Sequence, residues 1–161
     1  MMSNVILTSE ETIVMGDFWS GNIIIRTKES ADGSQTLEKV LVVDWEITKL
    51  GTPGNDIGQF AAEVYLPLAF YPACSDAANA IIEHFCSAYR SESQLFDKKV
   101  VDIASKQLGS HITVLTPEIK PWSENKARAR EVVEEGLKYL TGESIFPLFV
   151  AFDPFIAVKE E

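Results

Sequence analysis

A single loop near the amino terminus most strongly constrains what this chain can fold into. The loop is Met15-Gly16-Asp17-Phe18-Trp19-Ser20-Gly21-Asn22, and its Gly, Asp, Ser and Asn residues are turn formers. A short apolar run at 12–15 precedes it, and a run rich in isoleucine at 22–27 follows it. Another apolar run, at 39–44, ends on the carboxylates of Asp44 and Glu46. We therefore predict short strands around a loop, with polar side chains placed where the strands end.

These polar residues have the chemistry that phosphoryl transfer needs. Such an enzyme orients and deprotonates an acceptor hydroxyl and holds Mg²⁺ against the phosphates. Asp17 could accept the hydroxyl proton, while Asn22 and Asp44 could give one neutral and one charged oxygen ligand to a hard cation. The plainer alternative is that Asp17 and Asn22 are ordinary turn residues. In that case Asp44 and Glu46 are solvated carboxylates at the end of a strand.

Three segments together resemble a known superfamily. Residues 16–25 resemble the HGDxxxxN catalytic loop of the aminoglycoside phosphotransferases and choline kinases, which have a protein-kinase-like fold. Residues 42–46 resemble that superfamily's hDWE metal-binding segment, where h is a hydrophobic residue, and residues 51–58 resemble its GxPxxD segment. The segments occur in the superfamily's order, and the resemblance covers residues 12–140.

The resemblance implies a role for each matching residue. Asp17 would be the catalytic base that orients the acceptor hydroxyl, and Asn22 and Asp44 would be Mg²⁺ ligands, with ATP as co-substrate. Glu46 would act at a second metal or through water. Asp56, at the start of a helix, would be structural, with its carboxylate on backbone N–H groups of the catalytic loop.

The chain departs from the superfamily pattern in two respects. Met15 stands where the family has the His that buttresses the loop, so the loop loses that residue's hydrogen bonds. Residues 1–14 contain no Lys and no Gly-rich segment, so the parts that cover and bind the nucleotide are absent from them. We therefore expect that the amino-terminal lobe is missing and that this chain is a fragment, a truncated product or one partner of a split protein.

The rest of the chain predicts helices. Strands come first and four apolar helical patterns follow, which indicates an α+β protein with segregated elements. The resemblance implies that residues 1–161 form a single domain, the C-terminal lobe of a kinase-like enzyme. The strand at 39–44 is expected to be buried on both faces, and 141–161 to be an apolar tail on the surface or on a partner. The helix ends are predicted from caps at Asn55, Asp76 and Ser123, a stop at Pro67, and a C-terminal Gly142.

Composition excludes some classes of function. The 14 basic and 24 acidic residues give a formal charge of −10, which disfavours nucleic-acid binding. The chain has no apolar run long enough for a membrane span and no secretory signal, so we expect it to be cytoplasmic. Cys74 and Cys86 are expected to be buried thiols, and His84 to lie at the edge of the core.

The sequence leaves three functional hypotheses open. The first is a kinase that transfers the γ-phosphoryl group of ATP to a hydroxyl of a small molecule, whose identity the residues do not specify. The second is a catalytically inactive, pseudokinase-like binding or scaffold module, and the third is an acidic substrate-binding module. In each case we expect an apolar face that binds either an amino-terminal lobe or a second copy of the chain.

Overall fold

The computed structural model describes residues 12–93 and 97–150. The predicted α+β class is confirmed, with short strands first and helices after them. The strands are β1 (Thr12–Val14), β2 (Ile23–Glu29), β3 (Gln35–Val42) and β4 (Lys49–Gly51). The helices are α2 (Gly54–Phe70), α3 (Ser75–Glu92), α4 (Lys98–Glu118), α5 (Lys126–Thr141) and the short α6 (Pro147–Val150). Single 3₁₀ turns lie at Ser20–Asn22, Pro72–Cys74 and Trp122–Glu124.

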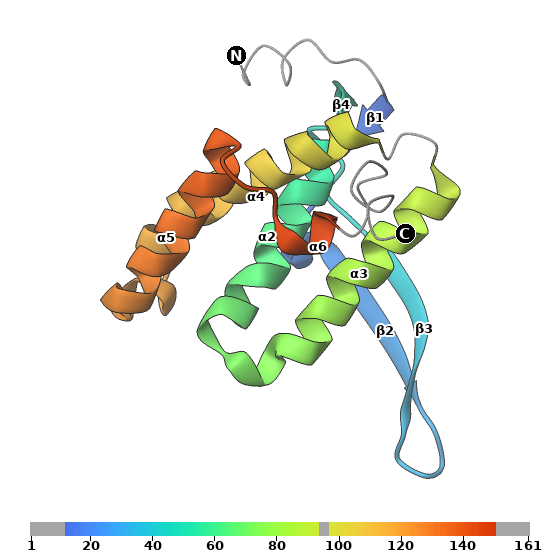
Figure 1. Ribbon diagram of the computed structural model, residues 1–161. Helices are drawn as coiled ribbons and strands as arrows, with labels where there is room; N and C mark the ends of the chain where they lie inside the picture. The colour runs from blue at the N-terminus through green and yellow to red at the C-terminus, as the bar shows by residue number, and fades with distance from the viewer. Residues whose placement is uncertain (1–11, 94–96, 151–161) are drawn as a thin grey trace, which may run out of the picture.

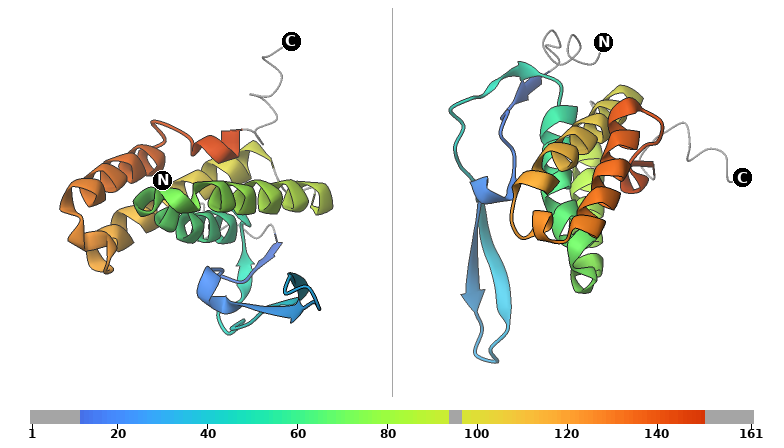
Figure 2. Two further views of the ribbon diagram at one scale, coloured as in Figure 1. Left: turned by 90° about the horizontal axis from the view of Figure 1, so that it is seen from below. Right: turned by 90° about the vertical axis from the view of Figure 1, so that its left-hand side faces the viewer.

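The strands and the helices form two separate parts in space. Helix α4 packs against both α2 and α5, and α3 lies beside α2 (Figure 1). Strand β1 pairs antiparallel with β4, and β2 pairs antiparallel with β3. The strands lie on one side of the helices, and the β2–β3 ribbon extends away from them (Figure 2). The loop at 15–22 therefore joins two small sheets next to the helices.

The hydrophobic core lies among the helices. Apolar residues recur every three or four positions along each long helix, which gives each helix one buried face. The face predicted for α4 is confirmed, and its buried members are Val100, Val101, Ile103, Ala104, Leu108 and Ile112. Helices α2 and α4 approach so closely that a Cβ on Gly58 would collide with the carbonyl oxygen of Ala104.

The helix boundaries correct several predicted caps. Helix α2 starts at Gly54, directly after Pro53, so Asn55 lies in the first turn and does not cap it. Pro67 lies inside α2, which continues to Phe70. A proline removes one helical N–H and crowds the carbonyl four residues before it, but it does not have to end a helix whose faces are already packed.

The later helices show the same kind of difference. Asp76 lies in the first turn of α3, which has no side-chain cap. The cap of α5 is Asn125, whose Oδ1 accepts the Arg128 N–H at 3.2 Å, whereas Ser123 belongs to the preceding 3₁₀ turn. Gly142 ends α5 in the left-handed conformation at φ 77°, as predicted.

The β2–β3 ribbon overturns the prediction of a strand buried on both faces. Of its large apolar side chains, Ile25 is 61% exposed, Leu37 64% and Val40 50%. Ile25 pairs with Val40, and the register places Leu37 opposite Thr27, two positions further along β2. These three apolar side chains therefore share one face of the ribbon. The prediction was wrong because a continuous apolar run is typical of a central strand, whereas β3 pairs on one side only, with β2.

The carboxyl-terminal segment is partly a core element. Phe146 and Phe149 are buried, with ring centroids 5.1 Å apart, and the Phe146 N–H donates to Ser105 Oγ at 2.9 Å. The expectation of a surface tail is therefore wrong for these two residues, and residues 151–161 lie outside the described part. Cys86 is buried as expected, but Cys74 and His84 are exposed. Within residues 12–93 and 97–150, no single helix is both long enough and apolar enough to cross a membrane.

Candidate active site

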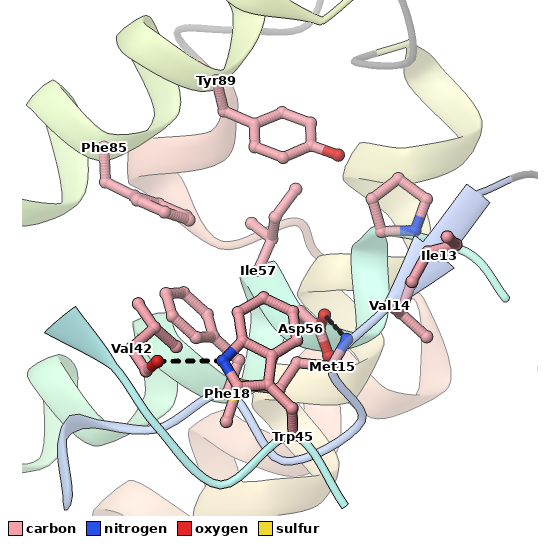
Figure 3. Close-up of a pocket in the computed structure, with 11 residues that line it drawn as sticks. Ile13, Val14, Met15, Phe18, Val42, Trp45, Asp56, Ile57, Phe85 and Tyr89 are labelled. Atoms are coloured by element: carbon pink, nitrogen blue, oxygen red, sulfur yellow. Dashed lines mark hydrogen bonds between the residues drawn. The ribbon is translucent and has the colours of Figure 1, made fainter. Parts of the chain in front are cut away.

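Asp56 anchors the backbone of the loop to the first turn of α2. The Met15 N–H donates to its Oδ2 at 2.7 Å (Figure 3), and the Gly16 N–H donates to its Oδ1 at 2.9 Å. Burial raises the pKa of the Asp56 carboxyl above its ordinary value, while the two N–H donors act in the opposite direction. Because each oxygen has a backbone donor, Asp56 fixes the position of the residues immediately before Asp17.

The Asp17 side chain contacts two amides. The Gln59 Nε2–H donates to Asp17 Oδ1 at 2.8 Å. The Asn22 Nδ2–H donates to the backbone oxygen of Asp17 at 3.0 Å and lies 3.3 Å from Oδ2. Since these contacts fix which end of the buried Asn22 amide carries the nitrogen, its Oδ1 is left as an acceptor for another partner.

The ribbon register brings Asp44 next to Asn22. Ile23 pairs with Val42, and the Val43 N–H donates to the backbone oxygen of Asn22 at 3.0 Å. Asp44 follows directly, with φ 68°, a left-handed conformation that residues other than glycine rarely adopt. Such backbone strain is most often found at functional sites.

The turn after Asp44 is held by its own hydrogen bonds. The Trp45 Nε1–H donates to the Val42 carbonyl at 2.9 Å (Figure 3), and the Thr48 hydroxyl donates to the Trp45 carbonyl at 2.7 Å. Asp44 and Glu46 are both exposed. The turn therefore presents two solvated carboxylates after β3, on the backbone segment whose Val43 N–H is bonded to the carbonyl of Asn22.

We call the group formed by Asp17, Asn22 and Asp44 the polar corner, and its oxygen donors fit Mg²⁺. In enzymes this ion is usually held by one or two carboxylates together with water and substrate phosphates. Asn22 Oδ1 and the Asp44 carboxylate are oxygen donors of that kind on adjacent backbone segments. The described residues contain no group of three or more His, Cys, Asp or Glu side chains that could hold a metal by themselves.

An apolar pocket of about 200 Å³ lies next to the loop (Figure 3). We call it the rear pocket, and its lining residues are Ile13, Val14, Met15, Phe18, Val42, Trp45, Pro53, Asp56, Ile57, Phe85 and Tyr89. Met15 is only 3% exposed and contributes apolar surface to this pocket. The Phe18 ring packs on Phe60 with centroids 5.1 Å apart, so the loop is also held by aromatic contact. Asp17 and Asn22 do not line the rear pocket, which is therefore separate from the polar corner.

A groove of about 260 Å³ lies at the far end of the loop. We call it the Ser20 groove, and it is lined by Ser20, Glu63, Val64, Pro67, Cys74, Ala77, Ala78 and Ile81. Its walls are mainly apolar, and Glu63 supplies a carboxylate. Glu63 Oε1 lies 2.7 Å from His111 Nε2, a partner that the sequence did not indicate. Glu135, on α5, is paired in a different way, since it accepts from the Tyr65 and Tyr139 hydroxyls at 2.6 and 2.5 Å.

Gln59 and the Glu63–His111 pair are the site residues that sequence reasoning missed. A helical period counted from Asp56 could have found Gln59 and Glu63, because residues three, four, seven and eight positions apart share one face of a helix. We call this face the loop-bearing stripe of α2, and its members are Asp56, Gln59, Phe60, Glu63, Val64 and Pro67. No such period indicates His111, which lies on α4. Trp122 packs on Phe70 and Tyr71, with ring centroids 5.0 and 5.7 Å away.

Comparison with known proteins places the chain near a class of kinases. Residues 8–64 match the model of the ecdysteroid kinase-like family, and this range contains the loop, the ribbon, Asp44 and the whole loop-bearing stripe up to Val64. The match is therefore concentrated on the segment that builds the polar corner.

Two curated relatives are named 4-hydroxytryptamine kinase. The chain is 28% identical over 135 residues to the protein of Psilocybe cyanescens, which covers 83% of this chain and 34% of the relative. It is 41% identical over 61 residues to the protein of Psilocybe cubensis, which covers 38% of this chain and 16% of the relative. The chain thus spans about a third or less of the length of the relatives it matches.

Proposed function

We propose that this chain carries the catalytic loop of an ATP- and Mg²⁺-dependent phosphotransferase that acts on a hydroxyl of a small molecule. In this proposal residues 1–161 form one domain, the C-terminal lobe of an enzyme like the aminoglycoside phosphotransferases and choline kinases. The observation that carries the proposal is the polar corner, where the Asp17 carboxylate and the Asn22 amide lie in contact beside the strained Asp44. The similarity to kinases over residues 8–64 supports it.

Asp17 would be the base of the reaction. The acceptor hydroxyl donates to the Asp17 carboxylate, which takes the proton as the hydroxyl oxygen forms its bond to the γ-phosphorus and the bond from that phosphorus to the bridging oxygen of ADP breaks. Asn22 and Asp44 would hold Mg²⁺, and Glu46 would act at a second metal or through water. When bound, the metal supplies positive charge against the phosphates.

The groups that cover the nucleotide would belong to an amino-terminal lobe outside these 161 residues. The length of the relatives supports this part of the proposal, because the chain covers only 34% of the Psilocybe cyanescens kinase. The isolated chain is then expected to show little or no turnover. The apolar face of the ribbon, formed by Ile25, Leu37 and Val40, would be covered by that lobe or by a second copy of the chain.

For the acceptor, we propose a hydroxylated aromatic amine, the kind of molecule in the name of the two relatives. The Ser20 groove supports this choice, because it combines apolar walls with the Glu63 carboxylate at the end of the catalytic loop. Glu63 lies one helical turn beyond Gln59, which contacts Asp17, and one turn rises about 5.4 Å. An amine at Glu63 and a hydroxyl at Asp17 could therefore belong to one small molecule.

Metal binding tests the proposal without requiring turnover. We expect Mn²⁺, followed by electron paramagnetic resonance, to bind the purified chain in the presence of ATP and to bind at least about tenfold more weakly to Asp44→Ala and Asn22→Ala, since each change removes an oxygen donor. Glu38→Ala is the matched control, because Glu38 is an exposed carboxylate of the same ribbon. Equal affinities in all four proteins would show that this corner is not the metal site.

A non-catalytic binding module is the second candidate. It is favoured by one observation, which is that Met15 fills an apolar position where the superfamily has a hydrogen-bonding His. Because the isolated chain is expected to show little turnover in either case, the test joins it to the amino-terminal lobe of a 4-hydroxytryptamine kinase. Phosphorylated 4-hydroxytryptamine, measured by mass spectrometry after incubation of this joined protein with ATP and Mg²⁺, then separates the two candidates. Product that disappears in Asp17→Ala supports the enzyme, whereas metal and nucleotide binding without any product supports the module.

A further inference from the structure

The first two turns of α2 contact successive residues of the loop. Asp56 binds the backbone at Met15 and Gly16, Gln59 binds the next side chain, and Phe60 packs under Phe18. Gln59 and Phe60 lie three and four positions after Asp56, so the three residues share one face of the helix. Gln59 is the one of the three that contacts the Asp17 carboxylate, at 2.8 Å.

The two oxygens of the Asp17 carboxylate have different surroundings. Oδ1 accepts from Gln59 Nε2 at 2.8 Å, a normal hydrogen-bond length, whereas Oδ2 lies 3.3 Å from Asn22 Nδ2. The Asn22 amide makes its shorter bond, 3.0 Å, to the backbone oxygen of Asp17. Gln59 is therefore the side chain that fixes the rotation of the carboxylate, and Oδ2 keeps more of its accepting capacity for another donor.

We propose that Gln59 is a positioning residue, which holds Asp17 in one rotamer with Oδ2 directed to the acceptor hydroxyl. This inference rests on the proposed function, because it assigns Oδ2 as the atom that takes the proton. A catalytic base must lie within hydrogen-bond reach of the proton it removes, and a misplacement of about 1 Å can cost roughly 100-fold in rate. A neutral amide suits this task, because it orients the carboxylate without adding a charge beside it.

Nuclear magnetic resonance of the full chain tests the contact directly. Three-bond couplings from the Asp17 backbone nitrogen and carbonyl carbon to Cγ report its χ1 angle. We expect one rotamer in the wild type and averaged couplings in Gln59→Leu, which keeps the volume of the side chain but lacks the donor. The matched control is Tyr65→Phe, which removes another hydrogen bond of α2, the one to Glu135, and should leave the Asp17 couplings unchanged.

The reciprocal variant keeps the test decisive if Gln59→Leu does not fold. In Asp17→Ala the side-chain amide signals of Gln59 should move, because they lose their acceptor, whereas Tyr65→Phe should leave them in place. Couplings that stay at one rotamer in a folded Gln59→Leu, or Gln59 amide signals that ignore Asp17→Ala, would overturn the inference.

Turnover separates this inference from the proposed function. The measurement uses a protein that contains both this chain and an amino-terminal lobe and that phosphorylates 4-hydroxytryptamine. In that protein, Gln59→Leu should lower kcat about 10- to 100-fold and leave KM for ATP nearly unchanged. Gln59→Glu should be lower still, because it places a second carboxylate against Asp17. If Asp17→Ala is inactive while Gln59→Leu keeps its full kcat, only the positioning role fails. If Asp17→Ala keeps its turnover, the proposed function itself fails.

Discussion

The segment at 12–51 and the helices at 54–150 differ in what they contribute, since the first carries the candidate site residues and the second forms the hydrophobic core. The strand segment carries Asp17, Asn22 and Asp44, but it exposes large apolar side chains, namely Ile13 (67%), Leu37 (64%), Ile25 (61%), Leu50 (58%) and Trp45 (54%). The helices bury most of their apolar residues around one core. The candidate chemistry therefore lies on a segment with little hydrophobic core of its own, and contacts from α2 hold that segment in place.

The largest expected effect is on the helical side of this comparison. Leu108 is fully buried in α4, so Leu108→Ala should lower the free energy of unfolding by about 2–5 kcal/mol. Urea unfolding followed by circular dichroism measures it. The matched change in the strand segment is Leu37→Ala, which should cost less than about 0.5 kcal/mol because the side chain is exposed. Equal costs would show that the ribbon is part of the folded core.

The next largest effect is expected at the connection between the two regions. Asp56→Ala removes the acceptor of the Met15 and Gly16 N–H groups, and leaving such donors unpaired costs about 1–3 kcal/mol each. Hydrogen exchange should show that these two amides lose protection while the Leu108 amide in α4 keeps it. Loss of protection across all the helices would mean that the two regions unfold as one unit.

The pH dependence of the free energy of unfolding is a smaller and more specific test of the contact between Asp56 and the loop. Burial raises the pKa of Asp56 in the folded chain above its ordinary value of 3.8, so the folded state binds this proton more tightly than the unfolded state does. The contribution of Asp56 to stability is therefore fully present below pH 3.8 and is lost as pH rises through the raised folded pKa. The stability of the wild type relative to Asp56→Asn should fall over that interval, as measured by urea unfolding at a series of pH values. A difference that is flat with pH, or that rises, would contradict the assignment.

The smallest effect on stability should accompany a clear effect on association. Ile25→Ser with Leu37→Ser should change the free energy of unfolding by less than about 1 kcal/mol and should reduce concentration-dependent self-association, measured by sedimentation. Val114→Ser is the control, because Val114 is 58% exposed on the helical side. If the control reduces association as much as the double change does, the ribbon is not the associating face.

Sequence reasoning predicted the local patterns and missed the contacts between distant segments. The α+β class, the apolar face of α4 and the end of α5 at Gly142 were all predicted, because each depends on spacing or on one conformational preference. The exposure of β3 was not predicted, because it depends on what packs against the strand and an apolar run does not show that.

The same limit applies to the candidate site. Gln59 looks like any polar residue of a helix, and its importance appears only when α2 and the loop are placed together. Glu63 and His111 are likewise 48 positions apart in the sequence, and neither indicates the other. The roles of Asp17, Asn22, Asp44, Glu46 and Asp56 came from the order of three segments, and they remain predictions that the experiments above address.

The close approach of Gly58 to Ala104 has a consequence for how variants of this chain would be interpreted. Any side chain at position 58 collides with the backbone of α4 and must displace α2, which carries Asp56 and Gln59 on its loop-bearing stripe. Such a displacement would reach Asp17 even though Gly58 has no functional group. In a screen scored only by loss of activity, Gly58 would be indistinguishable from a residue that takes part in the reaction. Only a parallel measurement of the geometry at Asp17 would show that its effect is mechanical.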